Sequence, residues 1–170
     1  MAEPPQAPAE PGGSAGRETV HATCVVIDEA GVLIRGAPGA GKSTLARELV
    51  AAAALAGRFA RLVSDDRTRL AARHGRLVAE AVGATAGWIE ARGVGILSVA
   101  HEPRAVVRLL VELSAEEPNR MPTPEEGLAT LCGVMVSCIR ARSGTPLADL
   151  VLFRLREVQG LSDSRFVTAR

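Results

Sequence analysis

Tyrosine is absent from this 170-residue chain, and three phenylalanines and one tryptophan supply all of its aromatic rings. Lysine is nearly absent too, because 19 of the 20 basic residues are arginine and the one exception is Lys42. So few rings leave little material for stacking on nucleic-acid bases. The net charge of +1 also argues against binding through a strong basic field. We therefore expect no nucleic-acid partner.

No apolar stretch approaches the roughly 18 residues that a membrane span needs, and the N-terminus resembles no secretory signal. Three cysteines, Cys24, Cys132 and Cys138, lie in apolar stretches without the spacing of a zinc site. This pattern predicts reduced thiols in the core. Apolar residues at 47% and charged residues at 23% are ordinary for a globular protein. We therefore expect a cytoplasmic protein with no membrane partner.

The composition divides the chain into one folded domain and two tails. Residues 1–18 hold four prolines and three glycines with hardly any bulky apolar side chain, which is typical of a disordered tail. We expect residues 19–160 to form the domain, which is long enough to bury a core, and residues 161–170 to form a C-terminal tail.

The apolar pattern predicts an α/β protein. Residues 23–27 and 32–34 are short apolar stretches around a turn, as in a β-hairpin. A helix is expected from Lys42 to about Gly57. Its apolar face should hold Leu45, Leu49 and Leu55.

Further strands are expected at residues 59–63, 96–99, 107–113 and 131–139, with a turn at His74-Gly75 and a surface loop over residues 114–127. Thr145 and Pro146 predict the N-cap and first position of a last helix. The apolar face of that helix should hold Leu147, Leu150, Val151 and Leu155. The order of elements predicts a mixed β-sheet with flanking helices.

A glycine-rich loop between the second strand and the first helix satisfies the pattern G-x-x-x-x-G-K-[ST]. Glycines let backbone N–H groups converge on phosphate oxygens at a helix N-terminus. Lys42 can reach the β- and γ-phosphates, and Ser43 can supply a hydroxyl ligand to Mg²⁺. The sequence thus predicts binding of ATP and Mg²⁺. The nucleotide-binding residues are predicted to be Gly36, Ala37, Pro38, Gly39, Ala40, Gly41, Lys42, Ser43 and Thr44.

Two acidic features follow the loop along the chain. Asp65 and Asp66 end the strand expected after the first helix, where ligands bind in α/β sheets. One of them can hold Mg²⁺ or its water, and the other can accept a proton from an attacking hydroxyl. Further on, residues 89–96 read Ile-Glu-Ala-Arg-Gly-Val-Gly-Ile. There Glu90 is a candidate Mg²⁺ ligand, and Arg92 is a candidate hydrogen-bond donor to a phosphate group.

The order of these features is distinctive: His21, then GAPGAGKS, then SDDR, then IEARGVGIL. It resembles the catalytic, C-terminal domain of HPr kinase/phosphorylase, a bacterial enzyme family that acts on a serine of the phosphocarrier protein HPr. More narrowly, it is similar to the short, alphaproteobacterial-type members. The resemblance spans roughly residues 21–120. It implies an HPr kinase/PEP-carboxykinase-like fold, a P-loop kinase catalytic domain over residues 19–160, a role in the phosphotransferase system and a homo-oligomer.

The resemblance also implies roles for single residues. His21 looks like the family's catalytic histidine and Lys42 like its phosphate-loop lysine, while Ser43 and Glu90 resemble the Mg²⁺ ligands. Asp66 looks like the residue that accepts the serine proton and returns one in the reverse phosphorolysis. Asp65 would support it beside His21. Arg120 falls where the family carries a further active arginine.

The chain departs from the family pattern in three places. Thr44 stands where many members have Glu, an alanine-rich insertion within residues 51–57 lengthens the link to Asp65, and no basic loop or long C-terminal helix is recognisable after Arg120. These departures leave the phosphorylase activity and the oligomeric state open. Two other functions also stay open: a P-loop kinase of a small metabolite, and a nucleotide-binding regulatory module without transfer activity.

Overall fold

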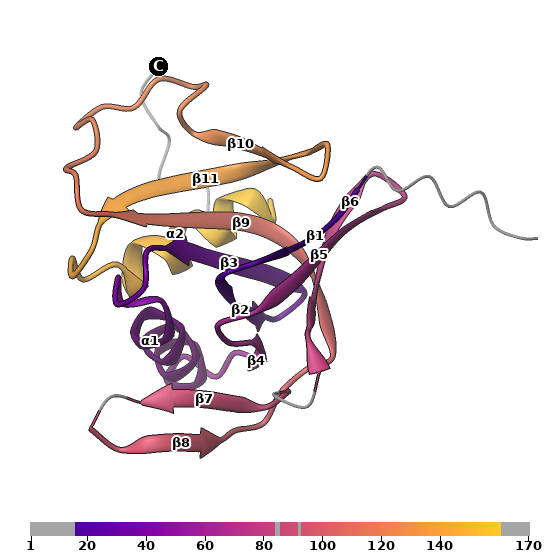
Figure 1. Cartoon of the computed structure of the whole chain (residues 1–170). Helices are drawn as coiled ribbons and strands as arrows, with labels where there is room; N and C mark the ends of the chain where they lie inside the picture. Colours follow the sequence, from indigo (N-terminus) through magenta and orange to yellow (C-terminus); the bar gives the residue numbers. More distant parts are fainter. Residues whose placement is uncertain (1–15, 84–85, 92, 161–170) are drawn as a thin grey trace, which may run out of the picture.

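The computed structural model describes residues 16–83, 86–91 and 93–160, and Figure 1 shows the whole chain. Within these residues the helices are α1 (Lys42–Leu55) and α2 (Ala148–Val158). The strands are β1 (Arg17–Val20), β2 (Ala22–Ile27), β3 (Ala30–Gly36), β4 (Ala60–Ser64), β5 (Thr68–Arg73), β6 (Arg76–Ala81), β7 (Trp88–Ala91), β8 (Gly95–Ser98), β9 (Arg104–Ser114), β10 (Leu128–Leu131) and β11 (Val134–Arg142).

The long strand β9 organises the sheet. One of its edges pairs in parallel with β3. Its other edge is shared, because β6 pairs antiparallel with residues 104–106 and β11 pairs in parallel with residues 109–114. The main path of the sheet runs β1-β5-β6-β9-β3-β2-β4, and within the described residues β7 and β8 form a separate two-stranded sheet. The predicted mixed sheet is confirmed.

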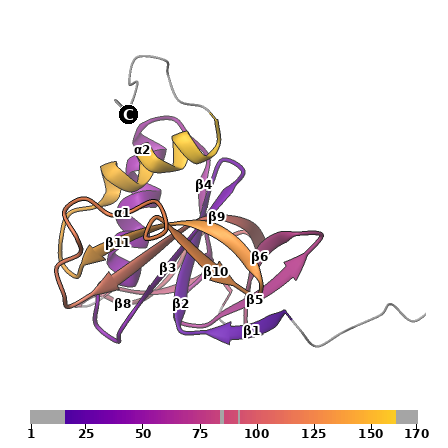
Figure 2. The same ribbon diagram turned by 90° about the horizontal axis from the view of Figure 1, so that it is seen from above.

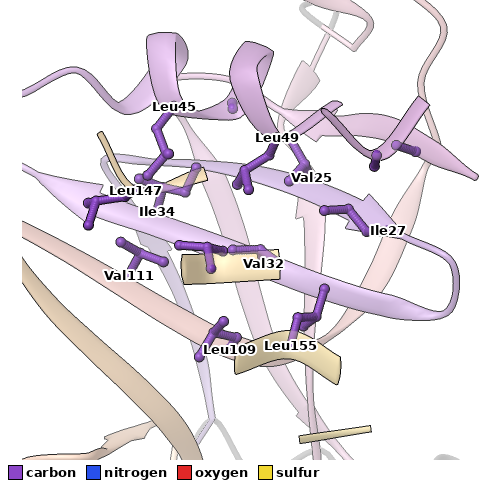
Figure 3. Close-up of a cluster of buried hydrophobic side chains, with 14 of the residues drawn as sticks. Val25, Ile27, Val32, Ile34, Leu45, Leu49, Leu109, Val111, Leu147 and Leu155 are labelled. Carbon is purple, nitrogen blue, oxygen red and sulfur yellow. The ribbon is translucent and has the colours of Figure 1, made fainter. Parts of the chain in front are cut away.

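Both helices cover the same face of the sheet. Leu49 of α1 and Leu155 of α2 belong to one buried cluster that includes Val32 of β3 and Leu109 of β9 (Figure 3). The opposite face buries a second cluster, which includes Leu33, Leu70, Leu110 and Cys138 and to which strands β5, β6, β10 and β11 contribute. Figure 2 shows α1 and α2 together on one side, away from β1 and β5. Adjacent residues of β3 therefore serve different clusters, as strand alternation requires. No helix in the described part of the chain is long and apolar enough to cross a membrane.

Several predicted elements are confirmed. β2 and β3 form the expected antiparallel hairpin, and α1 begins at Lys42. The turn at His74-Gly75 joins β5 to β6, and both of its residues have positive φ. The predicted apolar face of α1 is right for Leu45 and Leu49 but wrong for Leu55, which is 91% exposed. Leu55 is the last residue of the helix, where the end of α1 leaves it in solvent.

Other predictions are wrong. The single strand expected over residues 131–139 is two strands, β10 and β11, joined by a turn in which Cys132 has a φ of 50°. Cys132 is therefore only half-buried, unlike Cys24 and Cys138. The cap at Thr145 and Pro146 is also misplaced: α2 starts at Ala148, and its N-cap is Leu147 without a side-chain hydrogen bond.

The boundary of the predicted N-terminal tail also needs correction. Arg17 and Glu18, assigned to the tail over residues 1–18, belong to β1 and pair with Ala71 and Leu70 of β5. This pairing gives their backbone groups the partners that a disordered tail lacks. Residues 1–15 and the predicted tail over residues 161–170 lie outside the described residues.

Candidate active site

Three strand ends meet at one edge of the sheet. β2 is antiparallel to both β3 and β4, so β2 begins where the other two strands end. His21 precedes β2, the glycine-rich loop follows β3, and Asp65 follows β4. The loop between β3 and α1 marks this edge in Figure 1. A cleft of about 330 Å³ opens there, lined by His21, Pro38, Gly39, Gly41, Lys42, Ser43, Thr44, Asp66 and Glu90.

The glycine-rich loop presents the N-terminus of α1 to the cleft. Gly41 is the N-cap of α1 and has a φ of 97°, a left-handed conformation that favours glycine. The first N–H groups of a helix have no partner within the helix. The first turn of α1 holds no acidic side chain and thus leaves its partial positive charge uncompensated. This end of α1 is suited to bind an anion.

Lys42 lies beneath the loop, and only 7% of the residue is exposed. Its Nζ donates hydrogen bonds of 3.2 Å each to the carbonyl oxygens of Gly36 and Ala37. These bonds satisfy two of the three ammonium hydrogens and leave one for an anion. A buried charge needs such partners, so the ammonium is held in place before any phosphate arrives.

The carboxylate of Asp65 accepts three hydrogen bonds from three different elements. Its Oδ1 accepts from Thr23 Oγ1 at 2.7 Å and from Ser43 Oγ at 2.9 Å, and its Oδ2 accepts from the backbone N–H of Glu90 at 3.3 Å. Because Ser43 directs its hydroxyl hydrogen at Asp65, the lone pairs of its oxygen remain to face a cation. Asp65 thus orients a candidate metal ligand and links β2, α1 and β7.

Asp66 has different surroundings. Its backbone has a φ of 63°, which turns the side chain away from the path of β4. Oδ1 of Asp66 pairs with Nε2 of His21. The side chains are 73% and 43% exposed respectively, so a group arriving from solvent can reach them. The pair occupies one carboxylate oxygen and leaves the other to accept a proton.

Glu90 reaches the cleft from β7. Ile89 and Ala91 are buried, so strand alternation turns Glu90 outward, into the cleft that Ser43 also lines. Within the described residues no group of three or more His, Cys, Asp or Glu could hold a metal by itself. Mg²⁺ typically binds one or two carboxylates together with phosphate oxygens and waters. The oxygen donors of Ser43 and Glu90 therefore fit a Mg²⁺ ion that is shared with a triphosphate.

The structure brings most of the predicted site residues together. Asp65 lies directly behind the cleft, bonded to Ser43. Gly36, Ala37 and Ala40 belong to the loop but are not among the residues that line the cleft. Arg120 is exposed in the loop between β9 and β10 and does not line the cleft either, so its role stays a prediction. Arg92 lies outside the described residues.

A second cleft, of about 650 Å³, shares His21 with the first and is also lined by Gly36 of the loop. Arg35, Glu112 and Arg140 also line it. Glu112 lies 3.3 Å from Nε of Arg140 and 4.0 Å from a guanidinium nitrogen of Arg35. The three residues stand at matching positions on the adjacent strands β3, β9 and β11. This polar cleft continues the first one past His21.

Three site residues escaped the sequence analysis. Thr23, Ser64 and Thr68 are buried polar residues beside the two aspartates. The available signal was weak: each is a single hydroxyl residue in or next to an apolar stretch. Hydroxyl residues of this kind are common in strands, so they stand out only when their partners are known.

The chain is similar to known proteins along most of its length. A family model described as the HPr Serine kinase C-terminal domain matches residues 14–136. The HPr kinase/phosphorylase of Limosilactobacillus reuteri (strain DSM 20016) is 36% identical over 111 residues, which cover 61% of this chain and 33% of that protein. The protein of the same name from Clostridium tetani is 36% identical over 80 residues, covering 47% of this chain and 24% of that protein.

The fold has a counterpart among solved structures. The structure of the Hpr(Ser) kinase/phosphatase from Coxiella burnetii matches with a TM-score of 0.66 and 28% identity, covering 84% of this chain and 90% of that chain. The chain spans about a quarter to a third of the length of the curated relatives that it matches. The match of the family model over residues 14–136 includes every residue that lines the cleft at Lys42, and the chain belongs to the HPr serine kinase family.

Proposed function

We propose that this chain is the catalytic domain of an ATP- and Mg²⁺-dependent kinase that phosphorylates a serine of an HPr-type phosphocarrier protein. One observation carries the proposal: a single cleft joins a phosphate loop to the pair of His21 and Asp66. Relatives named HPr kinase/phosphorylase supply the class of acceptor. We also propose a cytoplasmic location, where ATP is available, and a homo-oligomeric enzyme.

The loop and Lys42 would bind the triphosphate. The N-terminus of α1 offers backbone N–H groups to phosphate oxygens, and Lys42 has one ammonium hydrogen left for the same purpose. Ser43 and Glu90 would hold Mg²⁺, which when bound would neutralise negative charge on the β- and γ-phosphates. Asp65 would keep the hydroxyl of Ser43 in the orientation that a metal ligand needs.

Asp66 would act as the base toward the acceptor serine. His21 occupies one oxygen of Asp66, and the other oxygen can accept the serine proton. As the proton leaves, the bond from the serine oxygen to the γ-phosphorus forms and the bond from that phosphorus to the bridging oxygen breaks. The products are phosphoserine, ADP and a proton held first on Asp66. Asp65 is less suited to this task because three hydrogen bonds already reach it.

A direct test incubates the purified protein with γ-labelled ATP, Mg²⁺ and the host's HPr, and maps the product by mass spectrometry. The expected result is one phosphoserine on HPr. The Asp66→Asn variant should still bind ATP but lose transfer, because an amide cannot accept the serine proton. A folded wild-type protein that binds ATP and leaves HPr unmodified would contradict the proposal.

The same assay separates the other two functions. ATP turnover that a small metabolite stimulates, and HPr does not, would indicate a metabolite kinase. A purely nucleotide-binding module would show no turnover with any acceptor, and Asp66→Asn would leave its behaviour unchanged. Incubating phosphoserine-HPr with inorganic phosphate and ADP-free enzyme tests for the reverse activity in the same format.

A further inference from the structure

The described part of the chain buries four polar or charged side chains in its interior, and all four lie at the candidate site. They are Thr23, Lys42, Ser64 and Thr68. Lys42 is accounted for by the phosphate loop. The other three are hydroxyl residues that no motif includes, and each makes a hydrogen bond next to the proposed catalytic groups. Buried hydroxyls are costly unless they are bonded, so their concentration at one place calls for an explanation.

Thr23 acts on Asp65. It is fully buried on β2, and its Oγ1 donates to Asp65 Oδ1 at 2.7 Å. The two residues are 42 positions apart in the chain. This bond is the shortest of the three that reach the carboxylate of Asp65. Thr23 therefore restricts the rotation of the carboxylate that in turn orients Ser43.

Thr68 acts on the backbone next to His21. Its Oγ1 donates to the carbonyl oxygen of Ala22 at 2.7 Å, and Ser64 Oγ lies 2.7 Å from the same Thr68 oxygen. A threonine hydroxyl has one hydrogen, and Thr68 uses it on Ala22, so Ser64 must be the donor to Thr68. Ala22 directly follows His21. Ser64 directly precedes the two aspartates, and Thr68 follows them by two residues.

We propose that Thr23, Ser64 and Thr68 form a hydroxyl clamp, a set of positioning residues that holds the start of β2 against the corner between β4 and β5. His21 stands on one side of this clamp and Asp66 on the other, so the clamp sets how the two side chains meet. The hydroxyl clamp rests on the proposed function for its catalytic meaning, but its effect on the pairing of His21 with Asp66 can be measured without any turnover.

The geometry distinguishes the clamp from ordinary core hydroxyls. The bonds from Thr23 to Asp65 and from Thr68 to Ala22 join β2 to the corner between β4 and β5. The bond from Ser64 to Thr68 braces the second of them, and none of the three is made within a single strand. Asp66 also needs the support, because its left-handed backbone is uncommon for a residue other than glycine and must be held by its surroundings.

The test uses matched pairs of variants. Thr68→Val and Thr23→Val remove the hydroxyl and keep the shape, while Thr68→Ser and Thr23→Ser keep the hydroxyl. Cys24→Ala is the control for stability alone, since Cys24 is buried beside Thr23 but packs into the cluster on the other face of the sheet. Two properties are measured: the kcat and KM of transfer to HPr, and the ring ¹⁵N NMR signals of His21, assigned with a His21→Gln spectrum.

Thr68→Val should lower kcat by about 10- to 100-fold, because small displacements of reacting groups have effects of that size, and should leave the KM for ATP within about twofold. It should also shift the ring signals of His21. Thr23→Val should raise the Mg²⁺ concentration for half-maximal activity about tenfold. Both serine variants should restore wild-type values, and Cys24→Ala should lower the unfolding midpoint without changing kcat or the His21 signals.

Valine variants that are destabilised like Cys24→Ala, yet keep the wild-type kcat and His21 signals, would overturn the clamp. If Thr68→Val does not fold, Ser64→Ala gives the same answer, since it removes only the bond that braces Thr68. If the wild-type protein transfers no phosphate to HPr, the proposed function fails. The clamp is then decided by the His21 signals alone: unchanged signals in Thr68→Val would reject it.

Discussion

Asp65 and Asp66 are identical neighbours in the sequence, but the fold gives them different surroundings. Asp65 continues the direction of β4 and accepts bonds from Thr23, Ser43 and Glu90. Asp66 turns out of the strand through its positive φ and meets His21 near solvent. The motif predicted that both carboxylates belong to the site. The contacts that distinguish them come from residues 22 to 45 positions away, so the residue pattern alone left the two roles open, and the resemblance to the family supplied the expectation that Asp66 accepts the proton.

This difference predicts unequal effects of the two Asp→Asn substitutions on stability. Asp65→Asn should lower the free energy of unfolding by about 1–3 kcal/mol, because an amide N–H₂ cannot accept the hydrogen bonds that the carboxylate accepts. Asp66→Asn should change it by less than about 0.5 kcal/mol, since the site is exposed and asparagine tolerates a left-handed backbone. Urea unfolding of both variants measures the difference. Equal losses would contradict the distinct roles of the two residues.

Lys42 gives the second prediction at the scale of residues. The chain uses arginine at every other basic position, yet the buried place under the phosphate loop holds its only lysine. Two carbonyl oxygens 3.2 Å from Nζ suit a compact ammonium, whereas a planar guanidinium is larger and differently shaped. Lys42→Arg should therefore abolish phosphoryl transfer although it keeps the charge.

The measurement is the transfer assay with HPr, together with ATP binding by calorimetry. Arg156→Lys, the reverse exchange at an exposed position of α2, is the matched control and should keep full activity. A fully active Lys42→Arg protein would show that the shape of the cation does not matter in this loop.

Among the elements, the hairpin of β7 and β8 was the hardest to predict. The stretch from residue 83 to 95 is rich in glycine, and no strand was predicted over β7. Trp88 is 51% exposed, while the smaller Ile89 and Ala91 face inward. Periodicity over four residues is too short to fix which side faces the protein. In contrast, the strands β2 and β3 and the helix α1 are longer and were predicted well, because their apolar patterns repeat.

The base of this hairpin depends on Gly87. Its φ is +78°, and a Cβ built there would lie 2.5 Å from Nδ1 of His101 and 3.1 Å from the carbonyl oxygen of Val99. Its own carbonyl accepts the N–H of Val99 at 2.8 Å. A side chain at residue 87 must displace the ring of His101 and press on the carbonyl of Val99, and through that backbone contact it strains the hairpin that carries Glu90.

Gly87→Ala should therefore raise the Mg²⁺ concentration needed for half-maximal transfer by about tenfold and lower the free energy of unfolding by about 2–4 kcal/mol. Gly83→Ala is the matched control, because Gly83 has a φ of +73° but a Cβ there meets nothing within 4 Å. Gly83→Ala should lower the free energy of unfolding by about 1–2 kcal/mol through backbone strain alone, and it should leave the Mg²⁺ requirement unchanged. Identical behaviour of the two variants would refute the contact with His101 as the cause.

At the scale of the whole molecule, the sheet separates two cores. Sequence patterns predicted the α/β class and the mixed sheet, because alternating residues of β9 and the apolar face of α1 are visible in the chain. They did not predict that β9 shares one edge between β6 and β11, since strand pairing joins residues far apart in the sequence. That division places β5, β6, β10 and β11 over the face that the helices leave uncovered, and it buries Cys24 and Cys138 there.

Burial of Cys24 predicts how the whole protein responds to alkaline pH. Loss of contact with water raises the pKa of its thiol to about 12. In the unfolded chain the thiol ionises near its ordinary pKa of about 8.5. Above about pH 9 the unfolded state has therefore released a proton that the folded state keeps. The free energy of unfolding should fall as pH rises, by up to about 1.4 kcal/mol per pH unit until the folded-state pKa is reached.

The composition makes this effect measurable, because apart from the other two cysteines only tyrosine and lysine side chains titrate in the range, and the chain has no tyrosine and one lysine. Urea unfolding of wild type and Cys24→Ala, under reducing conditions from pH 8 to 10.5, should give a shallower decline for the variant. Cys132→Ala, which removes a half-buried thiol, should alter the slope less. Parallel slopes for wild type and Cys24→Ala would mean that the second core admits water and that Cys24 ionises in the folded protein.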